Sequence, residues 1–304
     1  MPPSSAFARF AWFVLAWNIA VVLWGALVRV TGSGAGCGNH WPLCNGQFTP
    51  NPTAATMIEY THRAMTGLDS VMVLGLLVWA FRAFPRRHPV RLGATLSAVF
   101  LVTEAVIGAA LVKLEHVAKN ASAARGYSLS THLVNTLALL ACLALTAHWA
   151  SGKPGMSQPA IRLHGRAAWM AAVSLALVLV LGISGAIAAL GDTLFPARSL
   201  AAGLAQDFDP AASIFVRLRL LHPMIAAGAA LWLLFYGMSS ANGRPAARNA
   251  ARTMLACLGA QVLAGAANLL LLAPAWMQLI HLLLADLLWI GLVLLSAETL
   301  ANDQ

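Results

Sequence analysis

The chain has 304 residues, of which 60% are hydrophobic and only 10% are charged. A water-soluble globular domain has about 25% charged residues, so this composition excludes that class and indicates an integral membrane protein. The net charge of +9 could suggest a nucleic-acid partner. The basic residues instead cluster on one side of the predicted membrane topology, so we expect a lipid bilayer as partner and no nucleic acid.

The apolar residues form long segments, each of which can cross a bilayer as a helix of about 20 residues. The predicted spans are residues 10–31, 57–82, 92–113, 128–150, 167–190, 213–238, 251–272 and 276–298. The seventh span contains Gln261 and Asn268 and has the weakest signal. The sequence therefore predicts an all-α membrane protein with eight transmembrane helices.

In this arrangement most of the basic residues fall on one side. They are Arg9, Arg82, Arg86, Arg87, Arg91, Lys153, Arg162, Arg166, Arg244, Arg248 and Arg252. The positive-inside rule then places both termini in the cytoplasm and loops 32–56, 114–127, 191–212 and 273–275 outside. The first apolar stretch is too long for a signal-peptide core, so we interpret it as an uncleaved span of a bacterial inner-membrane protein.

The two halves of the chain look alike. The second and fourth spans of each half carry one histidine apiece, and the third has a polar residue before a glycine, Glu104 with Gly108 and Gln261 with Gly265. A tandem duplication of a four-helix unit is the simplest explanation of such a repeat. We therefore predict two pseudosymmetric four-helix bundles, formed by residues 1–150 and 151–304.

The repeated histidines are His62, His132, His222 and His281. A single histidine in a spanning helix can simply bond a neighbouring helix, but four in register point to a function. Two imidazoles on separate helices suit the two axial positions of haem iron. They suit zinc less well, since zinc usually has three or four protein ligands close together.

Two further sets of residues are compatible with haem in each half. The glycines that could leave room for the ring are Gly67, Gly108, Gly228 and Gly265. The arginines near the outer ends of spans, where they could pair with propionates, are Arg29, Arg63, Arg217 and Arg219. The same arginines could instead reach lipid headgroups.

The first outer loop contains Cys37 and Cys44 among several glycines and a proline. In an oxidising compartment this pair is expected to form a disulfide. The bond could be a static staple of the loop or an exchangeable, easily reduced disulfide. Both interpretations remain open on the sequence.

Acidic residues also lie within the spans. Glu59 precedes His62 by one helical turn and so shares its face, which suits proton transfer or, alternatively, pairing with Arg63 at the membrane surface. We expect the others to form hydrogen bonds between helices. They are Asp69, Glu104 and Asp286.

Several stretches together resemble the heme A synthase family over essentially the whole chain. They are Gly25-Ala26-Leu27-Val28-Arg29-Val30-Thr31-Gly32-Ser33-Gly34, Trp41-Pro42-Leu43-Cys44 after Cys37, Glu59-Tyr60-Thr61-His62-Arg63, Asp192-Thr193-Leu194-Phe195-Pro196, and Arg217-Leu218-Arg219 with His222-Pro223. The resemblance implies oxidation of the C8 methyl group of haem O to a formyl group. This would proceed by successive hydroxylations and give haem A for terminal oxidases.

The resemblance also implies which residues act in each half. His222 and His281 would hold a resident haem b, with Arg217 and Arg219 beside it.

In the first half, His62 and His132 would line the site for substrate haem O, with Arg29 and Arg63 binding it. Glu59 would be needed for activity.

Cys37 and Cys44 match the family's first-loop cysteines, proposed to help haem transfer or electron flow. Some members carry a second pair in the third outer loop, and residues 191–212 have none here. The implied partners are a haem O synthase and the terminal oxidase assembly machinery, and a homo-oligomer is possible.

Two other functions are compatible with parts of the sequence. A non-enzymatic haem carrier or bis-histidine electron-transfer cytochrome would use the same histidines. A quinol-linked thiol oxidoreductase would use Cys37 and Cys44, but it usually needs a shuttling dithiol and leaves the histidine repeat unexplained. The pigments that the protein contains would separate the synthase from the carrier.

Overall fold

The computed structural model describes residues 3–48, 50–152 and 164–301. Over these residues the regular structure is helical, and the extended pairing is one isolated bridge between Cys44 and Gln47. The long helices are α1 (Pro3–Val30), α2 (Ala54–Ala83), α3 (Pro89–Lys113), α4 (Ala123–Ala150), α5 (Arg166–Leu194), α8 (Leu221–Ser240), α9 (Pro245–Leu270) and α10 (Ala275–Leu300). Shorter ones are η1 (Ser33–Ala35), α6 (Leu200–Phe208) and α7 (Ile214–Arg219).

Eight helical stretches in the described part of the chain are long and apolar enough to cross a membrane. They coincide with the predicted spans, so the prediction of an all-α multi-pass membrane protein is confirmed. Several begin a few residues earlier than predicted because capping residues precede the apolar run. Thr53 accepts a hydrogen bond from the amide of Thr56 at the start of α2, and Ser122 accepts one from Arg125 at the start of α4.

The sequence predicted a single span over residues 213–238. In the structure this span is divided into two helices, α7 and α8, with a break at Leu220. Pro223 follows at the third position of α8 and has no amide hydrogen to donate to the carbonyl of Arg219, which weakens helical continuity there. The outer loop before it also contains the short helix α6, which the sequence did not predict.

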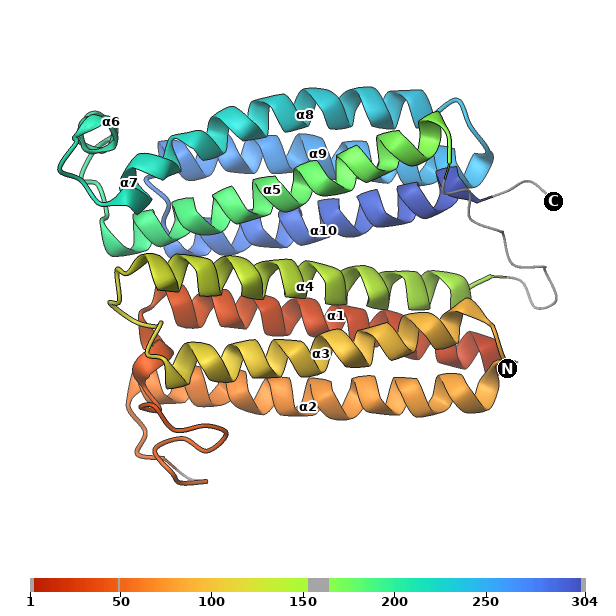
Figure 1. Ribbon diagram of the computed structural model, residues 1–304, viewed down its shortest axis with the longest axis horizontal. Coiled ribbons are helices and arrows are strands. Elements are labelled where there is room, and N and C mark those ends of the chain that lie inside the picture. The colour runs from red at the N-terminus through yellow and green to blue at the C-terminus, as the bar shows by residue number, and fades with distance from the viewer. Residues whose placement is uncertain (1–2, 49, 153–163, 302–304) are drawn as a thin grey trace.

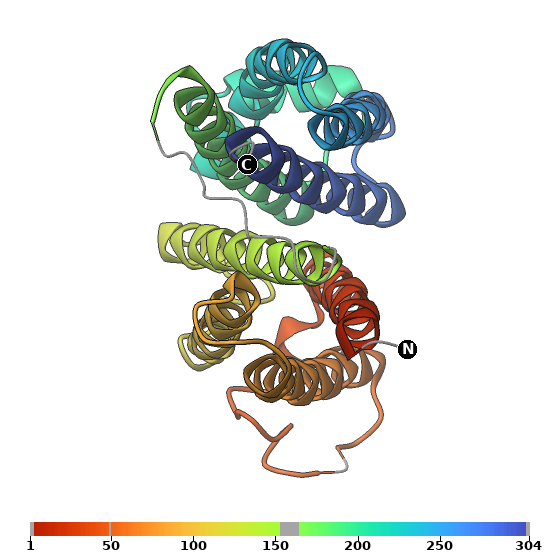
Figure 2. The same cartoon turned by 90° about the vertical axis from the view of Figure 1, so that its right-hand side faces the viewer.

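The helices form two groups of four. In one, α1, α2, α3 and α4 pack around one another; in the other, α5, α8, α9 and α10 do so (Figures 1 and 2). The groups meet where α4 contacts α5 and α10, and where α1 contacts α10. The indole of Trp289 on α10 donates a hydrogen bond to the carbonyl of Leu137 on α4, over 2.7 Å. The long helices thus form two groups of four, while the division into halves at residue 150 and their pseudosymmetry remain predictions.

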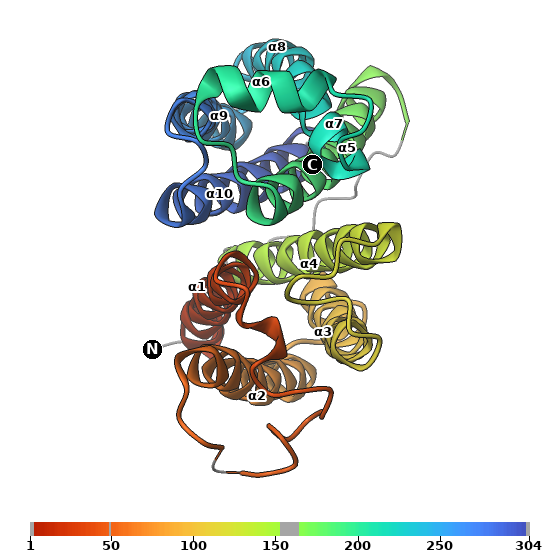
Figure 3. The same ribbon diagram turned by 90° about the vertical axis from the view of Figure 1, so that its left-hand side faces the viewer.

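The two ends of the molecule differ. The first outer loop, α6 and α7 lie at one end, and the start of α1 and the end of α10 lie at the other (Figure 1). Figure 3 looks onto the end that carries α6, which runs across the second group of helices. Two of the basic residues used to orient the chain, Lys153 and Arg162, lie outside the described residues.

Candidate haem-binding sites

The first histidine pair lies between α2 and α4. His62 on α2 faces Gly25 of α1, and His132 on α4 faces Gly108 of α3, within the same group of four helices. Among the described residues, the buried Nδ1 atom of His62 has no hydrogen-bond partner. The Nδ1 atom of His132 lies 2.9 Å from a carboxylate oxygen of Glu104 on α3. The structure therefore brings together the two first-half histidines that the sequence singled out.

The second histidine pair lies between α8 and α10. The ring centroids of His222 and His281 are 6.4 Å apart, and the ring planes are 85° from parallel. The hydroxyl of Ser184 on α5 lies 3.0 Å from Nδ1 of His222. The side-chain amide of Gln261 on α9 lies 3.4 Å from Nε2 of His281, whose Nδ1 is buried without a partner. The polar partners in this half are neutral.

The spacing of the second pair suits a single metal ion between two imidazoles. Metal–imidazole bonds are about 2 Å long, and the ring adds roughly 1 Å more to its centroid, so two rings on one ion lie roughly 6 Å apart. Buried imidazole nitrogens without partners are costly in a protein interior, and ligation would satisfy them. Among the described residues no group of three His, Cys, Asp or Glu side chains is placed to hold an ion. The spacing of the rings and the unpartnered nitrogen of His281 are compatible with a haem held by two histidines.

The polar neighbours of His132 and His222 would orient these rings for ligation. A partner at Nδ1 fixes the tautomer and leaves Nε2 available to a metal. Glu104 occupies this position for His132, and Ser184 does so for His222. Glu104 also accepts hydrogen bonds from Asn135, at 2.6 Å, and from Thr136. The expectation that Glu104 joins two helices is thus confirmed.

Glu59 is buried where α2 meets the first outer loop, with only 3% of its surface exposed. One carboxylate oxygen accepts a hydrogen bond from Arg63 at 2.6 Å, and the other accepts one from the backbone amide of Cys37 at 2.9 Å. The pairing with Arg63, one of the two alternatives predicted for Glu59, is therefore present. Glu59 also links the helix that carries His62 to the cysteine loop.

The predicted disulfide between Cys37 and Cys44 is present, and both residues are fully buried. Arg63 fastens the loop between them: its Nη1 atom donates to the carbonyls of His40 at 2.7 Å and Leu43 at 2.8 Å. The hydroxyl of Tyr60 donates to the carbonyl of Phe48 at 2.8 Å. The first outer loop is thus held against α2 near the first histidine pair.

The predicted propionate-binding arginines occupy different environments. Arg219 bonds Asp207 at 2.5 Å and Asp192 at 3.2 Å, and so fastens the third outer loop. Arg217 is exposed on α7. Arg29 crosses between the halves and donates to the carbonyl of Ala189 at 2.9 Å. A role for any of them toward propionate remains a prediction.

Other contacts of Arg29 strengthen the junction between the halves. Its guanidinium also reaches the hydroxyl of Thr193 on α5 and the side-chain oxygen of Gln278 on α10, both at 3.0 Å. A second buried arginine, Arg125, was missed from the sequence. Arg125 donates to the carbonyls of Ala118 and Asn120, and so holds the second outer loop as Arg63 holds the first. Its position just after the helix cap Ser122 was the available signal.

Two of the glycines predicted to make room for a ring do lie beside histidines. Gly108 faces His132 and Gly265 faces His281, whereas Gly67 and Gly228 face open space. The sequence did not predict the contacts of His62 with Gly25 on α1 or of His222 with Gly185 on α5. No spacing along the chain signals these contacts, because each joins two separate helices.

The remaining intramembrane acids differ from each other. Asp69 accepts a hydrogen bond from Asn18 on α1 at 2.7 Å, as predicted for a residue that joins two helices. Asp286 is 1% exposed, and its Oδ2 atom has no partner among the described residues. The expectation that Asp286 joins two helices therefore remains a prediction.

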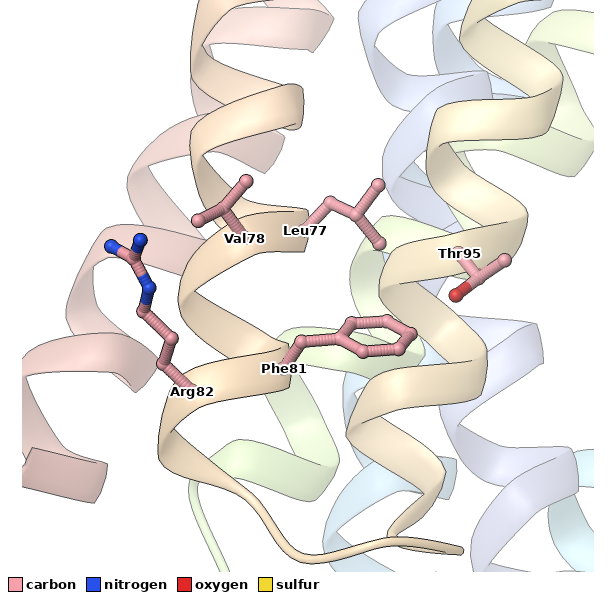
Figure 4. A pocket seen from close by; sticks show the side chains of 5 residues that line it. All are labelled: Leu77, Val78, Phe81, Arg82 and Thr95. Atoms are coloured by element: carbon pink, nitrogen blue, oxygen red, sulfur yellow. The ribbon is translucent and has the colours of Figure 1, made fainter.

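An apolar groove lies elsewhere, between α2 and α3. It is lined by Leu77, Val78, Phe81, Arg82 and Thr95 (Figure 4). Phe81 follows His62 on α2 by 19 residues, which at 1.5 Å per residue is roughly 28 Å along the helix. The groove therefore lies toward the opposite end of α2 from the histidines and does not belong to either candidate site.

Comparisons with known proteins agree with this architecture. A family described as cytochrome oxidase assembly protein matches residues 8–293. A Thermus thermophilus protein named protoheme IX farnesyltransferase is 48% identical over 304 residues, covering 98% of this chain and 49% of the relative. The chain thus spans about half the length of this relative.

Shorter matches join the chain to proteins named heme A synthase. The one from Geobacillus kaustophilus is 48% identical over 105 residues, which is 33% of each chain. The one from Halalkalibacterium halodurans is 36% identical over 137 residues, covering 45% of this chain and 44% of the relative.

Proposed function

The chain belongs to the cytochrome oxidase assembly protein family, and from this premise we propose that it is a heme A synthase. The proposed reaction oxidises the C8 methyl group of haem O to a formyl group through successive hydroxylations. The observation that carries the proposal is the presence of two histidine pairs in a membrane protein, one of them next to a buried carboxylate.

Each half has its own proposed role. Residues 1–150 hold substrate haem O between His62 and His132, and residues 151–304 hold a resident haem b between His222 and His281. The assignment rests on Glu59 and the disulfide, because both lie in the first half and contact one another. The second half offers two imidazoles with neutral partners, an arrangement suited to electron transfer.

When bound, haem supplies the redox chemistry that a methyl carbon–hydrogen bond requires. The protein positions the porphyrin and handles protons. His62 and His132 fix the substrate between α2 and α4, and Glu104 holds the tautomer of His132. Glu59 serves as a proton acceptor one helical turn from His62, and Arg63 keeps its carboxylate oriented.

The partners follow from the reaction and from the relatives. The Thermus thermophilus relative is named as a farnesyltransferase and is about twice as long as the matched region. We infer that a haem O synthase delivers the farnesylated substrate and that terminal oxidase assembly takes up the product. The proposed location is the bacterial inner membrane, with cytoplasmic termini and the haem sites toward the periplasm.

Pigment extraction tests the proposal. The full chain is expressed in a membrane that makes haem O but lacks its own heme A synthase, and the haems are separated by chromatography. We expect haem A or its hydroxymethyl precursor, and His62→Ala should abolish both. Recovery of only haem B and unchanged haem O from well-folded protein would contradict the proposal.

That contrary result would favour the second candidate, a haem carrier or electron-transfer cytochrome, which the paired imidazoles also suit. A thiol oxidoreductase is less well supported, since the sulfurs of Cys37 and Cys44 are fully buried and an external dithiol must reach a sulfur to exchange. Replacing both cysteines with serine should leave some haem conversion but would abolish a thiol-oxidising activity.

A further inference from the structure

Each of the four candidate ligands lies against a glycine of a neighbouring helix. The pairs are His62 with Gly25 of α1, His132 with Gly108 of α3, His222 with Gly185 of α5, and His281 with Gly265 of α9. The histidines come from the second and fourth spans of each half, and the glycines come from the first and third. The contact therefore recurs once for every ligand.

The distances show how closely these helices approach the rings. A methyl group added at Gly25 or Gly185 would lie 3.0 Å from Cε1 of the facing imidazole, and one at Gly265 would lie 3.1 Å away. These separations are tighter than nine in ten real contacts of a Cβ atom. At Gly108 the nearest ring atom would be 3.6 Å away, which is ordinary van der Waals contact.

Other glycines in these spans contact different atoms or none. A Cβ added at Gly93 on α3 would meet Thr146, and one at Gly237 on α8 would meet Leu255. Gly75 on α2 and Gly259 on α9 have no other atom within 4 Å of an added Cβ. Close packing at glycine is therefore common in these helices, and what distinguishes the four positions is that the neighbour is a candidate ligand.

The rings differ in what else holds them. Within the described part of the chain the Nδ1 atoms of His62 and His281 have no hydrogen-bond partner, so the contacts with Gly25 and Gly265 help to hold these rings. His222 has both a tight contact with Gly185 and a partner at Nδ1, the hydroxyl of Ser184. His132 is held by Glu104 and has the loosest glycine contact.

We propose that Gly25, Gly185 and Gly265 are positioning residues that set the plane and depth of the facing imidazoles for haem ligation. This inference rests on the proposed haem-binding function. An added methyl group has to displace the ring by a few tenths of an ångström, which rotates or withdraws a ligand. At Gly108 the added methyl group would lie 3.6 Å from Nε2 of His132, so we expect a smaller displacement of the ring there.

The test uses alanine substitutions in the full chain, purified with its haem. Gly25→Ala should change one low-spin ferric haem signal in the electron paramagnetic resonance spectrum, or lose that haem, while the second signal is unchanged. Gly185→Ala and Gly265→Ala should do the same to the other haem. Gly75→Ala and Gly259→Ala should retain wild-type spectra and haem content, because the added methyl group meets no other atom within 4 Å.

Alanine favours helix by about 1 kcal/mol over glycine, so none of these changes should weaken its own helix. Wild-type spectra and haem content in Gly25→Ala and Gly185→Ala would overturn the inference. So would loss of both haems together with loss of monodisperse protein, because that result indicates general collapse. His62→Ala and His222→Ala distinguish failure of the glycine inference from failure of the proposed haem sites. If these two variants kept both haems, the haem-site assignment itself would fail.

Discussion

The two histidine pairs sit in similar helical settings but differ in charge. Three residues before His62 the first half has Glu59, and three residues before His222 the second half has Arg219. In the first half Glu104 faces His132, whereas in the second half Gln261 faces His281.

Hydrogen-bond partners tune a metal through the ligands they contact. The difference therefore suggests why one half would carry out chemistry while the other stores or transfers an electron. Under the proposed function, the polar residues around each histidine pair would distinguish the half that carries out the chemistry from the half that transfers an electron.

The largest expected effect comes from removing the carboxylate of Glu59, whose counterpart in the second half is Arg219. Glu59→Gln keeps the size of the side chain and an oxygen that can accept from the amide of Cys37, but it cannot accept a proton. We expect haem A formation to fall by about 10²-fold or more, the usual contribution of a general base, with both haems still bound. The ratio of haem A to total haem measures this.

The matched control is Glu115→Gln, which changes an exposed carboxylate of the second outer loop and should leave the ratio unchanged. A Glu59→Gln protein that binds haem and makes haem A at the normal rate would remove Glu59 from the chemistry. The difference between the halves would then lie elsewhere.

Exchanging the residue types at Glu104 and Gln261 should shift the reduction potentials of the two haems. A carboxylate at the ring nitrogen that does not bind the metal makes an imidazole a stronger donor and so lowers the potential of the metal. Glu104 contacts Nδ1 of His132, and Gln261 contacts Nε2 of His281. Glu104→Gln should raise the potential of the first-half haem, and Gln261→Glu should lower that of the second. A hydrogen bond to a charged group is worth about 1.5 kcal/mol, which corresponds to about 60 mV for one electron.

Optical redox titration of the purified protein measures both changes. The two substitutions serve as controls for each other, because each should move one haem and leave the other in place. Shifts in the same direction, or no shift in either protein, would show that Glu104 and Gln261 do not distinguish the sites.

Much of the fold could be predicted because a bilayer restricts a chain to few solutions. The eight spans followed from apolar length, and the depth of the four histidines followed from topology. The break before α8 could not be read from hydropathy, although Pro223 was visible, because many spans tolerate a proline within the helix. The short helix α6 lies in a loop whose apolar residues are too few to form a span.

The site was less predictable than the fold for a similar reason. The residue types and the disulfide were visible in the sequence, but the contacts between helices were not. Arg63 resembled a propionate ligand, yet it fastens the cysteine loop through backbone carbonyls. Gly25 gave no signal, since its significance depends on a ring from another helix. Such contacts depend on how the helices pack, which periodicity along one helix does not encode.

The smallest expected effect concerns two buried acids, one in each half. Both Asp69 and Asp286 are 1% exposed and have one buried oxygen without a partner among the described residues, but the other oxygen of Asp69 accepts a hydrogen bond from Asn18. Asp69→Leu leaves the side-chain amide of Asn18 without its hydrogen-bond acceptor, so it should lower the free energy of unfolding by about 1–3 kcal/mol. Asp286→Leu should be neutral or stabilise by about 1 kcal/mol, since a buried polar atom without a partner is itself costly.

Thermal unfolding in detergent compares the two variants directly, with haem content measured on the same samples. Equal destabilisation would mean that Asp286 has a partner as important as Asn18. Loss of haem from Asp286→Leu without loss of stability would be more informative. It would give a carboxyl group five residues beyond His281 a role in the second site, and the halves would then differ less than their hydrogen bonds indicate.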